Sequence, residues 1–368
     1  MNQKSPSKAK KVWKGIGIAV AVILGILLII FAVLLISEYR PKDTETLDVD
    51  GTSSKTLAPG DSMSIMTWNT GYAGLGENAD FFMDGGTNVM SEDEEGVHTN
   101  IAGITSLLKE TDPDVVFLQE VDRNSKRTYH IDELKEYEDA LPGYQAVHAL
   151  NYKALYVPYP LKPTTIGQVT SGIATLSSYE LSSAERISLP CSFSWPVSAF
   201  NLKRCLLVSR VKLEGTDKEL VLVNLHLEAY DDGEGKIAQT KQLKELLESE
   251  AQKGNYVIAG GDFNQSFSNF DNRDYPLVDE SYWAPGELDT SEFDETLRFV
   301  ADNSVPSCRS LDKPLTTAED KDASVFQYYM IDGFIISNNL KVNNLETIDA
   351  GFKYSDHNPM LLNVTLEK

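Results

Sequence analysis

Polar residues that could bind a cation or move a proton follow several apolar runs of this sequence. They are Asn69, Glu120, Asn224 with His226, Asp262 with Asn264, Asp332, and Asp356 with His357. Alternate residues of an extended chain share a face, so Asn224 pairs with His226, and Asp262 with Asn264. Carboxylates and amides suit one hard cation, and imidazoles and carboxylates can transfer protons. The set as a whole therefore predicts a cation site that activates water.

Each of these residues has a simpler structural interpretation when it is taken alone. An Asp or Asn at a strand end commonly bonds nearby backbone amides in a turn or cap. Gly260-Gly261 is typical of a tight bend, His226 of a satisfied core or surface histidine, and Glu120 of a solvated charge at the start of a loop. The chemical prediction thus depends on the whole set meeting in space.

The segments around these residues resemble the endonuclease/exonuclease/phosphatase superfamily, the DNase I-like metal-dependent phosphoesterases. In the family's order they are TWN at 67–69, LQEVD at 118–122, NLHLE at 224–228, GGDFN at 260–264, MIDGFIIS at 330–337 and SDHNP at 355–359. GDFN together with SDH is highly specific, whereas residues 171–177 give weaker support. The resemblance covers about residues 65–366 and implies an α/β fold. The fold that the resemblance implies is a four-layer α/β/β/α sandwich with the site at one edge.

The resemblance also implies a cation site and a base. Glu120 is expected to be the principal ligand of a Mg²⁺ ion, with Asn69 beside it and Asp356 assisting, and Mn²⁺ is the alternative ion. Asp262 is expected to orient and deprotonate the attacking water. Asn264 is expected to hold the nucleophile or a phosphate oxygen.

The remaining residues are expected to act on the phosphate. His357, fixed by Asp332, would stabilise the transition state, because an Asp partner favours the imidazolium, whose unperturbed pKa is about 6.5. His226 with Asn224 would contact the phosphate from the opposite side, and Asn69 and Asn224 are the expected substrate-binding amides. Attack would be in line, without a covalent enzyme intermediate.

Two features of the sequence depart from the family pattern. The family commonly has a basic residue two positions before the Asp and an aromatic residue after it, where this chain has Met330 and Gly333. A family Tyr or similar group of the middle segment has no secure match, and Tyr156 and Asn151 are the candidates.

Short strand-like and helical runs alternate through the region that carries the motifs, as expected for layers of helix and sheet around one core. Strands are predicted at 64–68, 114–118, 171–176, 205–213, 219–228, 255–259, 328–337 and 359–366. Helices are predicted at 97–109 and 236–252, and long loops at 71–96 and 265–324.

An uncharged apolar run of 22 residues occupies positions 15–36. As a helix it would span about 33 Å, which suffices for a hydrocarbon core of about 30 Å. The alternatives are a buried core helix and a cleaved signal peptide, but the run is longer than an ordinary signal core and no small-x-small site follows it. Five lysines precede it, namely Lys4, Lys8, Lys10, Lys11 and Lys14. They predict a single-pass anchor of the cell membrane with an extracellular C-terminal domain.

We therefore divide the chain into a cytoplasmic basic segment (1–14), a transmembrane helix (15–36), a tether (37–60) and a catalytic domain (61–368). The tether contains Pro41 and Pro59 and has little hydrophobic periodicity. Outside the cell, Cys191 and Cys205 could form a disulfide and leave Cys308 single. Three small buried thiols are the alternative.

The charge of the chain limits its partners. The 368 residues include 55 acidic and 33 basic ones, for a net charge of −22. Long nucleic acid is disfavoured as a partner because phosphate contacts dominate such binding, and Lys203-Arg204 is interpreted as an ordinary solvated turn. We expect a monomer that hydrolyses a phosphodiester or phosphomonoester. The alternatives are an extracellular nuclease of the same superfamily and an inactive surface binding module with this fold.

Overall fold

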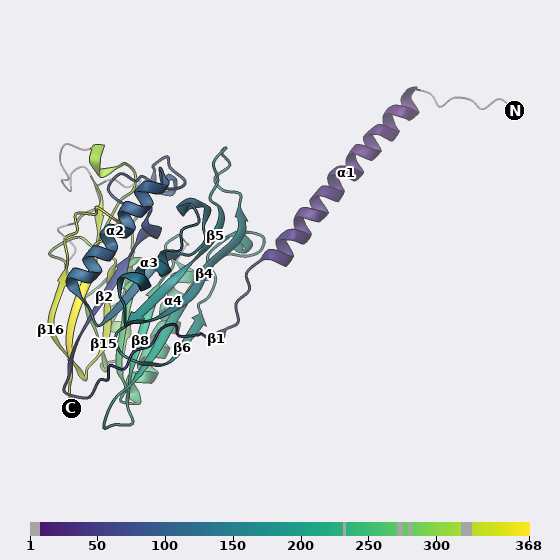
Figure 1. The fold of residues 1–368 in the computed structure, drawn as a ribbon. Coiled ribbons are helices and arrows are strands. Elements are labelled where there is room, and N and C mark those ends of the chain that lie inside the picture. Colours follow the sequence, from purple (N-terminus) through teal and green to yellow (C-terminus); the bar gives the residue numbers. More distant parts are fainter. Residues whose placement is uncertain (1–7, 231–232, 271–274, 279–281, 318–325) are drawn as a thin grey trace.

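Two β-sheets stacked face to face form the body of the protein, and helices cover their outer faces (Figure 1). The computed structural model describes residues 8–230, 233–270, 275–278, 282–317 and 326–368. One sheet has six strands in the order β16-β17-β2-β3-β5-β4, and the other has seven in the order β1-β6-β7-β8-β9-β15-β12. The predicted four-layer DNase I-like sandwich is confirmed.

The strand boundaries differ from the predicted runs by a few residues, and four of the eight predicted strands are longer in the structure. The six-stranded sheet consists of β2 (Ser62–Asn69), β3 (Val115–Asp122), β4 (Gln145–Val157), β5 (Gly167–Ser177), β16 (Leu340–Thr347) and β17 (Met360–Leu366). The seven-stranded sheet consists of β1 (Thr44–Thr46), β6 (Leu181–Ser188), β7 (Cys205–Lys212), β8 (Glu219–His226), β9 (Tyr256–Asp262), β12 (Leu297–Val300) and β15 (Asp332–Ser337). The prediction did not include β4, β6, β12 or β16.

The predicted loop 265–324 contains short strands, and parts of it lie outside the described residues. β10 (Gln265–Phe267) pairs with β11 (Gly286–Leu288), and β13 (Cys308–Arg309) pairs with β14 (Tyr328–Tyr329). The predicted strand 328–337 therefore splits into β14 and β15, with Met330 and Ile331 between them.

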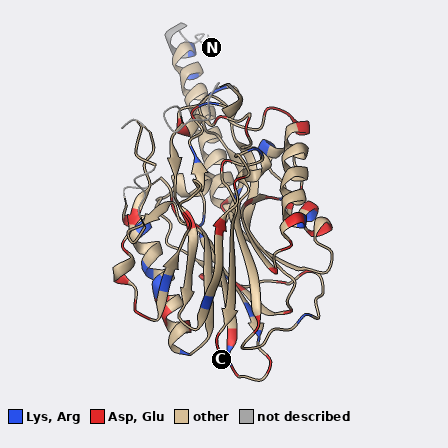
Figure 2. Ribbon diagram, turned by 90° about the vertical axis from the view of Figure 1, so that its left-hand side faces the viewer, with Lys and Arg blue, Asp and Glu red and all other residues tan. Residues whose placement is uncertain are grey.

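Alternation along the central strands creates the layers. In β3, Val115 and Phe117 enter the core between the sheets, whereas Val116 and Leu118 pack under the helices. β8 alternates in the same way, with Leu222 inside and Val223 outside. Each fully buried side chain of this size contributes about 1.5–3 kcal/mol. Charged residues are accordingly sparse along the strands and frequent on helices and connections (Figure 2).

Three helices cover the sheets. α2 (Glu94–Thr111) and α3 (Glu133–Ala140) pack on the six-stranded sheet, and α4 (Glu234–Gln252) packs on the seven-stranded sheet. Asp93 begins α2 by accepting a hydrogen bond from the Gly96 N–H at 2.7 Å, and Asp112 ends it in the left-handed conformation. α2 and α4 were predicted, whereas the eight-residue α3 was not.

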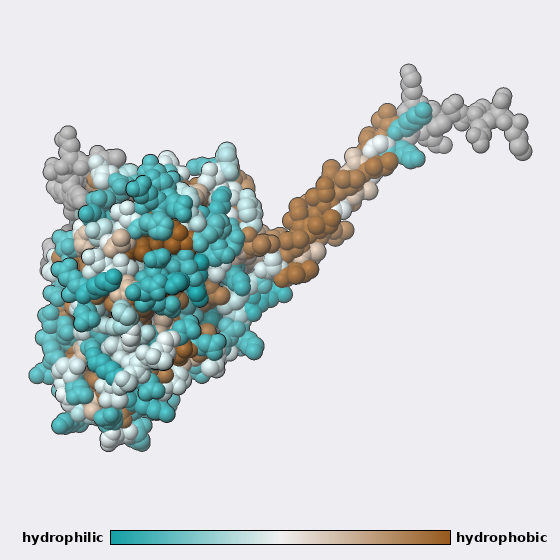
Figure 3. Space-filling view, in the orientation of Figure 1, coloured by the Kyte–Doolittle hydropathy of each residue, from teal (hydrophilic) through white to brown (hydrophobic). Residues whose placement is uncertain are grey.

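A fourth helix, α1 (Lys8–Ser37), projects from the domain, and beyond the lysines of its first two turns its surface is mostly apolar (Figure 3). Residues 11–37 are long and apolar enough to cross a membrane, by length and composition. Residues 1–7 of the predicted cytoplasmic segment lie outside the described residues.

The segment after α1 differs from the predicted free tether. β1 pairs with β6, and further bridges join Asp50 to Ala146 and Leu57 to Leu213. Residues 44–57 therefore run along the domain and cover the edge of β6, so that only a short piece of chain separates α1 from the body.

Cys191, Cys205 and Cys308, which all fall within the described residues, are free thiols. The disulfide between Cys191 and Cys205 that the sequence permitted is not formed. Cys205 and Cys308 are buried, in agreement with the alternative of small apolar residues, whereas Cys191 is exposed.

Candidate active site

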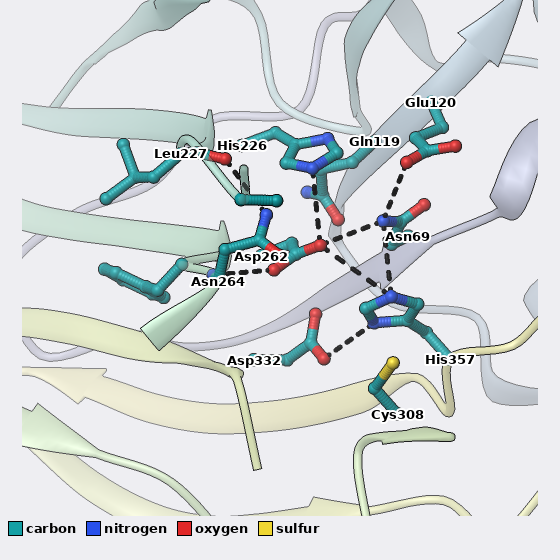
Figure 4. A network of polar contacts seen from close by, with 12 residues as sticks. Asn69, Gln119, Glu120, His226, Leu227, Asp262, Asn264, Cys308, Asp332 and His357 are labelled. Atoms are coloured by element: carbon teal, nitrogen blue, oxygen red, sulfur yellow. Dashed lines mark hydrogen bonds and ion pairs between the residues drawn. The ribbon is translucent and has the colours of Figure 1, made fainter. Parts of the chain in front are cut away.

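Strand pairing brings the predicted residues to one edge of the sandwich. β2 and β3 run parallel, as do β8 and β9, so the carboxyl ends of both pairs lie at this edge. In the seven-stranded sheet, His226 pairs with Asp262, and Asp262 pairs with Asp332. This register sets an imidazole and two carboxylates in one row (Figure 4).

Two glycines let the neighbouring strands approach closely enough for this row to form. A Cβ on Gly261, whose φ is +151°, would collide with the Leu225 carbonyl oxygen of β8. A Cβ on Gly260 would lie 2.5 Å from the Phe334 ring of β15. The glycine pair is therefore required by strand packing inside β9 and does not form a bend.

Asp262 is the centre of the network. Its Oδ2 accepts a hydrogen bond from Asn69 Nδ2 at 3.0 Å and lies 3.4 Å from His226 Nε2 and 3.7 Å from His357 Nε2. Its Oδ1 accepts from the Asn264 N–H at 2.8 Å. Burial and the charge of Asp332 raise the pKa of Asp262 to about 7, against the lowering effects of His357, Asn264 and Asn69. A carboxylate with this pKa can act as a base near neutral pH.

His357 and Asp332 form the second part of the network. His357 Nδ1 lies 2.9 Å from Asp332 Oδ2. Burial alone would lower the pKa of His357, but its neighbours Cys308, Asp332 and Asp356 outweigh burial and raise it well above the usual value. Burial raises the pKa of Cys308 itself to about 12, so its thiol is neutral near pH 7. The two carboxylates therefore favour the imidazolium.

His226 is in the opposite electrostatic state. Burial, Arg204 and His357 together lower its pKa well below the usual value, so its ring is neutral. With Nε2 directed at Asp262, its Nδ1 has no hydrogen-bond partner among the described residues. One cationic and one neutral imidazole thus face the same carboxylate.

Backbone strain marks two of the site residues. Glu120 has φ +58° and Asn264 has φ +51°, both in the left-handed region that non-glycine residues rarely adopt. The pairing of β3 with β5 is irregular between Leu118 and Val121, which turns the partly exposed Glu120 out of the regular ladder. Asn264 directs its own Nδ2 to the Leu227 carbonyl at 3.0 Å. Such strain is concentrated at functional sites.

Glu120 and Asp356 fit a hard divalent cation. Both carboxylates line one cavity, and burial raises the pKa of each. The charge of Asp356 also raises the pKa of Glu120. Two like charges in one cavity are stabilised by a cation between them, and Mg²⁺ prefers one or two carboxylates together with waters and phosphate oxygens.

Two other groups of candidate ligand atoms fit such an ion less well. Cys308, Asp356 and His357 form one, and Asp262, Asp332 and His357 form the other, each with its atoms within 4.8 Å of one another. His357 Nδ1 is already bonded to Asp332, and the Cys308 thiol is protonated and soft. Each group thus includes a nitrogen or sulfur atom that Mg²⁺ does not favour as a ligand, whereas Glu120 and Asp356 supply oxygens alone.

The two amides expected to bind substrate differ in position. Asn69 lines the cavity, but its Oδ1 accepts from the Gly71 N–H at 3.0 Å and its Nδ2 faces the carboxylates. In this orientation the Asn69 amide donates to Asp262, and its Oδ1 has one lone pair beyond the bond from Gly71, so its role as a cation ligand stays a prediction. Asn224 is fully buried between the sheets, where its Nδ2 donates to the Ala174 carbonyl at 2.7 Å and its Oδ1 accepts from Gln119 at 2.8 Å. The structure does not bring Asn224 to the cavity.

A cavity of about 580 Å³ opens over the network and is lined by all of the predicted residues except Asn224 and Asp332. Asn151, one of the two candidates from the middle segment, also lines it, whereas Tyr156 is exposed elsewhere on the same strand. This volume is typical of a small-molecule site.

The comparisons with known proteins agree with this geometry. Residues 66–357 match the model of the Endonuclease/Exonuclease/phosphatase family. The chain belongs to this family. A comparison with curated proteins gives no match.

Solved structures share the family fold at low identity. The endonuclease/exonuclease/phosphatase from Beutenbergia cavernae is 17% identical over 83% of this chain and 72% of that one, with a TM-score of 0.58. The human Nocturnin catalytic domain with bound sulfate anion is 15% identical over 87% and 96%, with a TM-score of 0.51. ANGEL2, a 2',3'-cyclic phosphatase, in complex with adenosine-2',3'-vanadate, is 14% identical over 88% and 99%, with a TM-score of 0.53.

One residue of this family member's site was missed by the sequence analysis. Arg204 is 4% exposed and lines the cavity, so it does not belong to a solvated turn. Its charge lowers the pKa of Glu120 and of His226, which lie close to it. In the described part of the chain, its Nε and Nη1 atoms have no hydrogen-bond partner. A buried guanidinium with free donors is suited to a phosphate group.

Proposed function

We propose that this protein is a membrane-anchored, outward-facing, Mg²⁺- or Mn²⁺-dependent phosphoesterase. The observation that carries the proposal is the Asp262 carboxylate, with a pKa of about 7, between a neutral and a cationic imidazole in a cavity that is also lined by the buried guanidinium of Arg204. This is the arrangement that hydrolysis of a phosphate ester by water requires.

Asp262 acts as the base. The Asn264 N–H and the Asn69 amide hold its two oxygens, so the carboxylate is fixed in orientation and can receive a proton from a water in the cavity. Asn264 orients Asp262 through its backbone and stays beside the attacking water.

His357 and Arg204 stabilise the charge on the phosphoryl group. The Asp332 carboxylate keeps His357 protonated, so that its Nε2 can donate to a phosphoryl oxygen or to the leaving oxygen. Arg204 offers donors from the opposite wall, beside His226. Preorganised donors of this kind commonly contribute a factor of about 10²–10³ each to the rate.

Glu120 and Asp356 would hold the cation, which supplies Lewis-acid stabilisation of the phosphate when it is bound. The five lysines before the apolar run at 15–36 and the length of that run support an anchor with the domain outside the cell.

The test uses the full-length chain in detergent micelles with bis(4-nitrophenyl) phosphate and 4-nitrophenyl phosphate. We expect hydrolysis with Mg²⁺ or Mn²⁺, loss of activity with EDTA, and recovery when the metal is restored. His357→Ala should lose about three orders of magnitude. His98→Ala, which replaces an exposed histidine on α2, is the matched control and should keep full activity. Full activity of His357→Ala would contradict the mechanism, and an inactive wild type would favour a binding module.

A further inference from the structure

The cavity has an apolar wall that phosphoryl chemistry does not require. Tyr152, Val157 and Ile166 pack together there with Phe200 and Leu202. A phosphate group gains nothing from such a surface, whereas each buried methylene of a hydrocarbon chain gains about 0.8 kcal/mol. The substrate that fits this cavity therefore carries a substantial apolar part.

The same wall adjoins α1. Residues 191–202, here called the lip loop, supply Pro196 and Val197 to the cavity, and the Trp195 ring lies 5.1 Å from the Phe31 ring of α1. Phe31 precedes the end of α1 at Ser37 by six residues, or about 9 Å along the helix. A bilayer that holds α1 therefore also receives Trp195, a residue type that favours the membrane interface.

Polar contacts hold the lip loop against the end of the helix. Glu38, directly after α1, accepts a hydrogen bond from Ser198 Oγ at 3.3 Å and pairs with Lys203 Nζ at 3.4 Å. The Glu38 side chain is only 7% exposed. The position of the cavity relative to the end of α1 is thus fixed by the fold.

A second apolar element lies beside the lip loop. Tyr152 Oη of β4 donates to the Phe200 carbonyl at 3.0 Å, and the β4–β5 hairpin lies on the side of the domain where α1 ends (Figure 1). At and near the tip of this hairpin, Leu155 is 63% and Leu161 92% exposed. Exposed apolar side chains grouped in this way mark a membrane or protein contact, and their position beside α1 favours the membrane.

The charge of this region differs from that of the rest of the chain. The sequence has no Asp or Glu between Asp139 and Glu180, nor between Glu185 and Glu214, although about one residue in seven of the whole chain is acidic. Lys153, Lys162 and Lys203 lie within these stretches. The side of the domain opposite α1, which Figure 2 shows, carries many acidic residues. The region beside α1 is thus the one suited to anionic lipid headgroups.

We propose that the substrate is a phosphodiester lipid of the leaflet next to the catalytic domain, with its hydrocarbon chains along the apolar wall and its phosphate between Arg204 and Asp262. This rests on the proposed phosphoesterase function and names its substrate class. Hydrolysis consumes one water. The water oxygen forms a new P–O bond, an ester P–O bond breaks, and the released alkoxide takes up the proton that the water loses.

The experiment reconstitutes the full-length chain in vesicles of phosphatidylcholine and phosphatidylglycerol with Mg²⁺, and follows lipid products by ³¹P NMR after extraction. Bis(4-nitrophenyl) phosphate is assayed in parallel. We expect hydrolysis of vesicle phospholipid that is lost in Asp262→Asn. Hydrolysis of the soluble ester without hydrolysis of phospholipid would overturn the lipid assignment alone, whereas hydrolysis of neither would overturn the proposed function as well.

A paired variant tests the membrane contact separately. Leu155→Glu combined with Leu161→Glu places two charges on the hairpin tip, outside the residues that line the cavity. Phospholipid hydrolysis should fall about tenfold, which corresponds to about 1.4 kcal/mol, with an unchanged melting temperature and unchanged soluble-ester hydrolysis. The control is Asn343→Glu with Asn344→Glu on β16, exposed positions at the edge of the domain far from α1 (Figure 1). Equal phospholipid rates for the two variants would overturn the contact.

Discussion

Two buried carboxylates in opposite electrostatic states lie at the two ends of strands β8 and β9, Glu250 of α4 at one end and Asp262 of β9 at the other. At the amino-terminal ends, Glu250 accepts from Arg210 Nη2 at 2.8 Å, Lys253 Nζ at 2.9 Å and Asn255 Nδ2 at 2.6 Å. Burial would raise the pKa of Glu250, but these donors outweigh burial and lower it to about 2. At the carboxyl-terminal ends, Asp262 keeps a pKa of about 7.

The difference lies in the neighbours that each carboxylate has. Glu250 meets two cations and an amide, so its ionised form is favoured and it links β7, α4 and the start of β9. Asp262 is deeply buried and meets the like charge of Asp332, and these two effects outweigh the cationic His357 and the Asn69 and Asn264 donors, so its ionised form is disfavoured. The carboxylate at the amino-terminal ends thus stabilises the fold, whereas the carboxylate at the carboxyl-terminal ends has the pKa of a catalytic base.

Asp262→Asn removes the ionisable carboxylate at the carboxyl-terminal ends of the strands and should have the largest effect on activity. We expect kcat for a phosphodiester to fall at least about a thousandfold, because the base is lost. The free energy of unfolding at pH 8 should stay equal or rise, because a buried charge with a raised pKa is removed. Urea denaturation checks the second part, and a clear loss of stability would show that the ionised carboxylate stabilises the fold.

Arg204→Ala should lower kcat/KM about a hundredfold, because a phosphate loses its buried guanidinium partner. Arg204→Lys keeps the charge but loses the planar donor geometry and should recover only part of this loss. Steady-state kinetics with a soluble diester measure both variants. Arg210→Lys, at the opposite end of the same sheet, is the control and should leave kcat/KM unchanged.

Glu250→Gln removes the charge that binds Arg210 and Lys253 at the amino-terminal ends of the strands. We expect a loss of about 2 kcal/mol in the free energy of unfolding at pH 7, with unchanged kcat, because charge-assisted hydrogen bonds are weakened. The folded pKa of about 2 lies below the ordinary value of 4.5, so the stabilisation is present above pH 4.5 and is lost as the pH falls toward 2. Urea titrations at several pH values should therefore show the variant and the wild type converging in acid. A difference that persists at pH 2 would contradict this assignment.

Asp332→Asn should have the smallest effect of these variants, a shift in the pH dependence of kcat/KM. The wild-type kcat/KM should rise through about pH 7, where Asp262 ionises, and fall at higher pH, where His357 loses its proton. Because Asp332 raises the pKa of both groups, its removal should move both limbs to lower pH. If the rising and falling parts of the profile keep the same pH midpoints in the variant, neither Asp262 nor His357 governs the pH dependence of kcat/KM.

Most of the residues that the sequence singled out meet at one edge of the sandwich. Parallel pairing brings the carboxyl ends of β2, β3, β8 and β9 there, whereas Asp332 begins β15 and His357 precedes β17. Asn224 was predicted to bind substrate, but the structure buries it between the sheets. Alternation shows which face of a strand a residue lies on, but it does not show which groups of the other sheet lie opposite that residue. Here Gln119 and Ala174 bind its amide. Arg204 was missed because a basic residue in a short pair has no periodicity, and its burial comes from tertiary packing.

The fold class also followed from the sequence, but several elements did not. β4 has 13 residues with an irregular burial pattern, so alternation does not reveal it. β1 covers the edge of β6 with only three residues, too few for any pattern. Both elements depend on neighbours that are distant in the chain.

Residues 44–57 are held against the domain, which limits how far the domain can move from the end of α1. Six residues separate Ser37 from Thr44, and they are held at both ends, Glu38 by Ser198 and Lys203 and the Lys42 carbonyl by Ser188. The connection is therefore short and cannot extend freely. In the proposed membrane-anchored enzyme, this connection would keep the cavity close to the bilayer that holds α1, so that substrates on a neighbouring cell would lie out of reach.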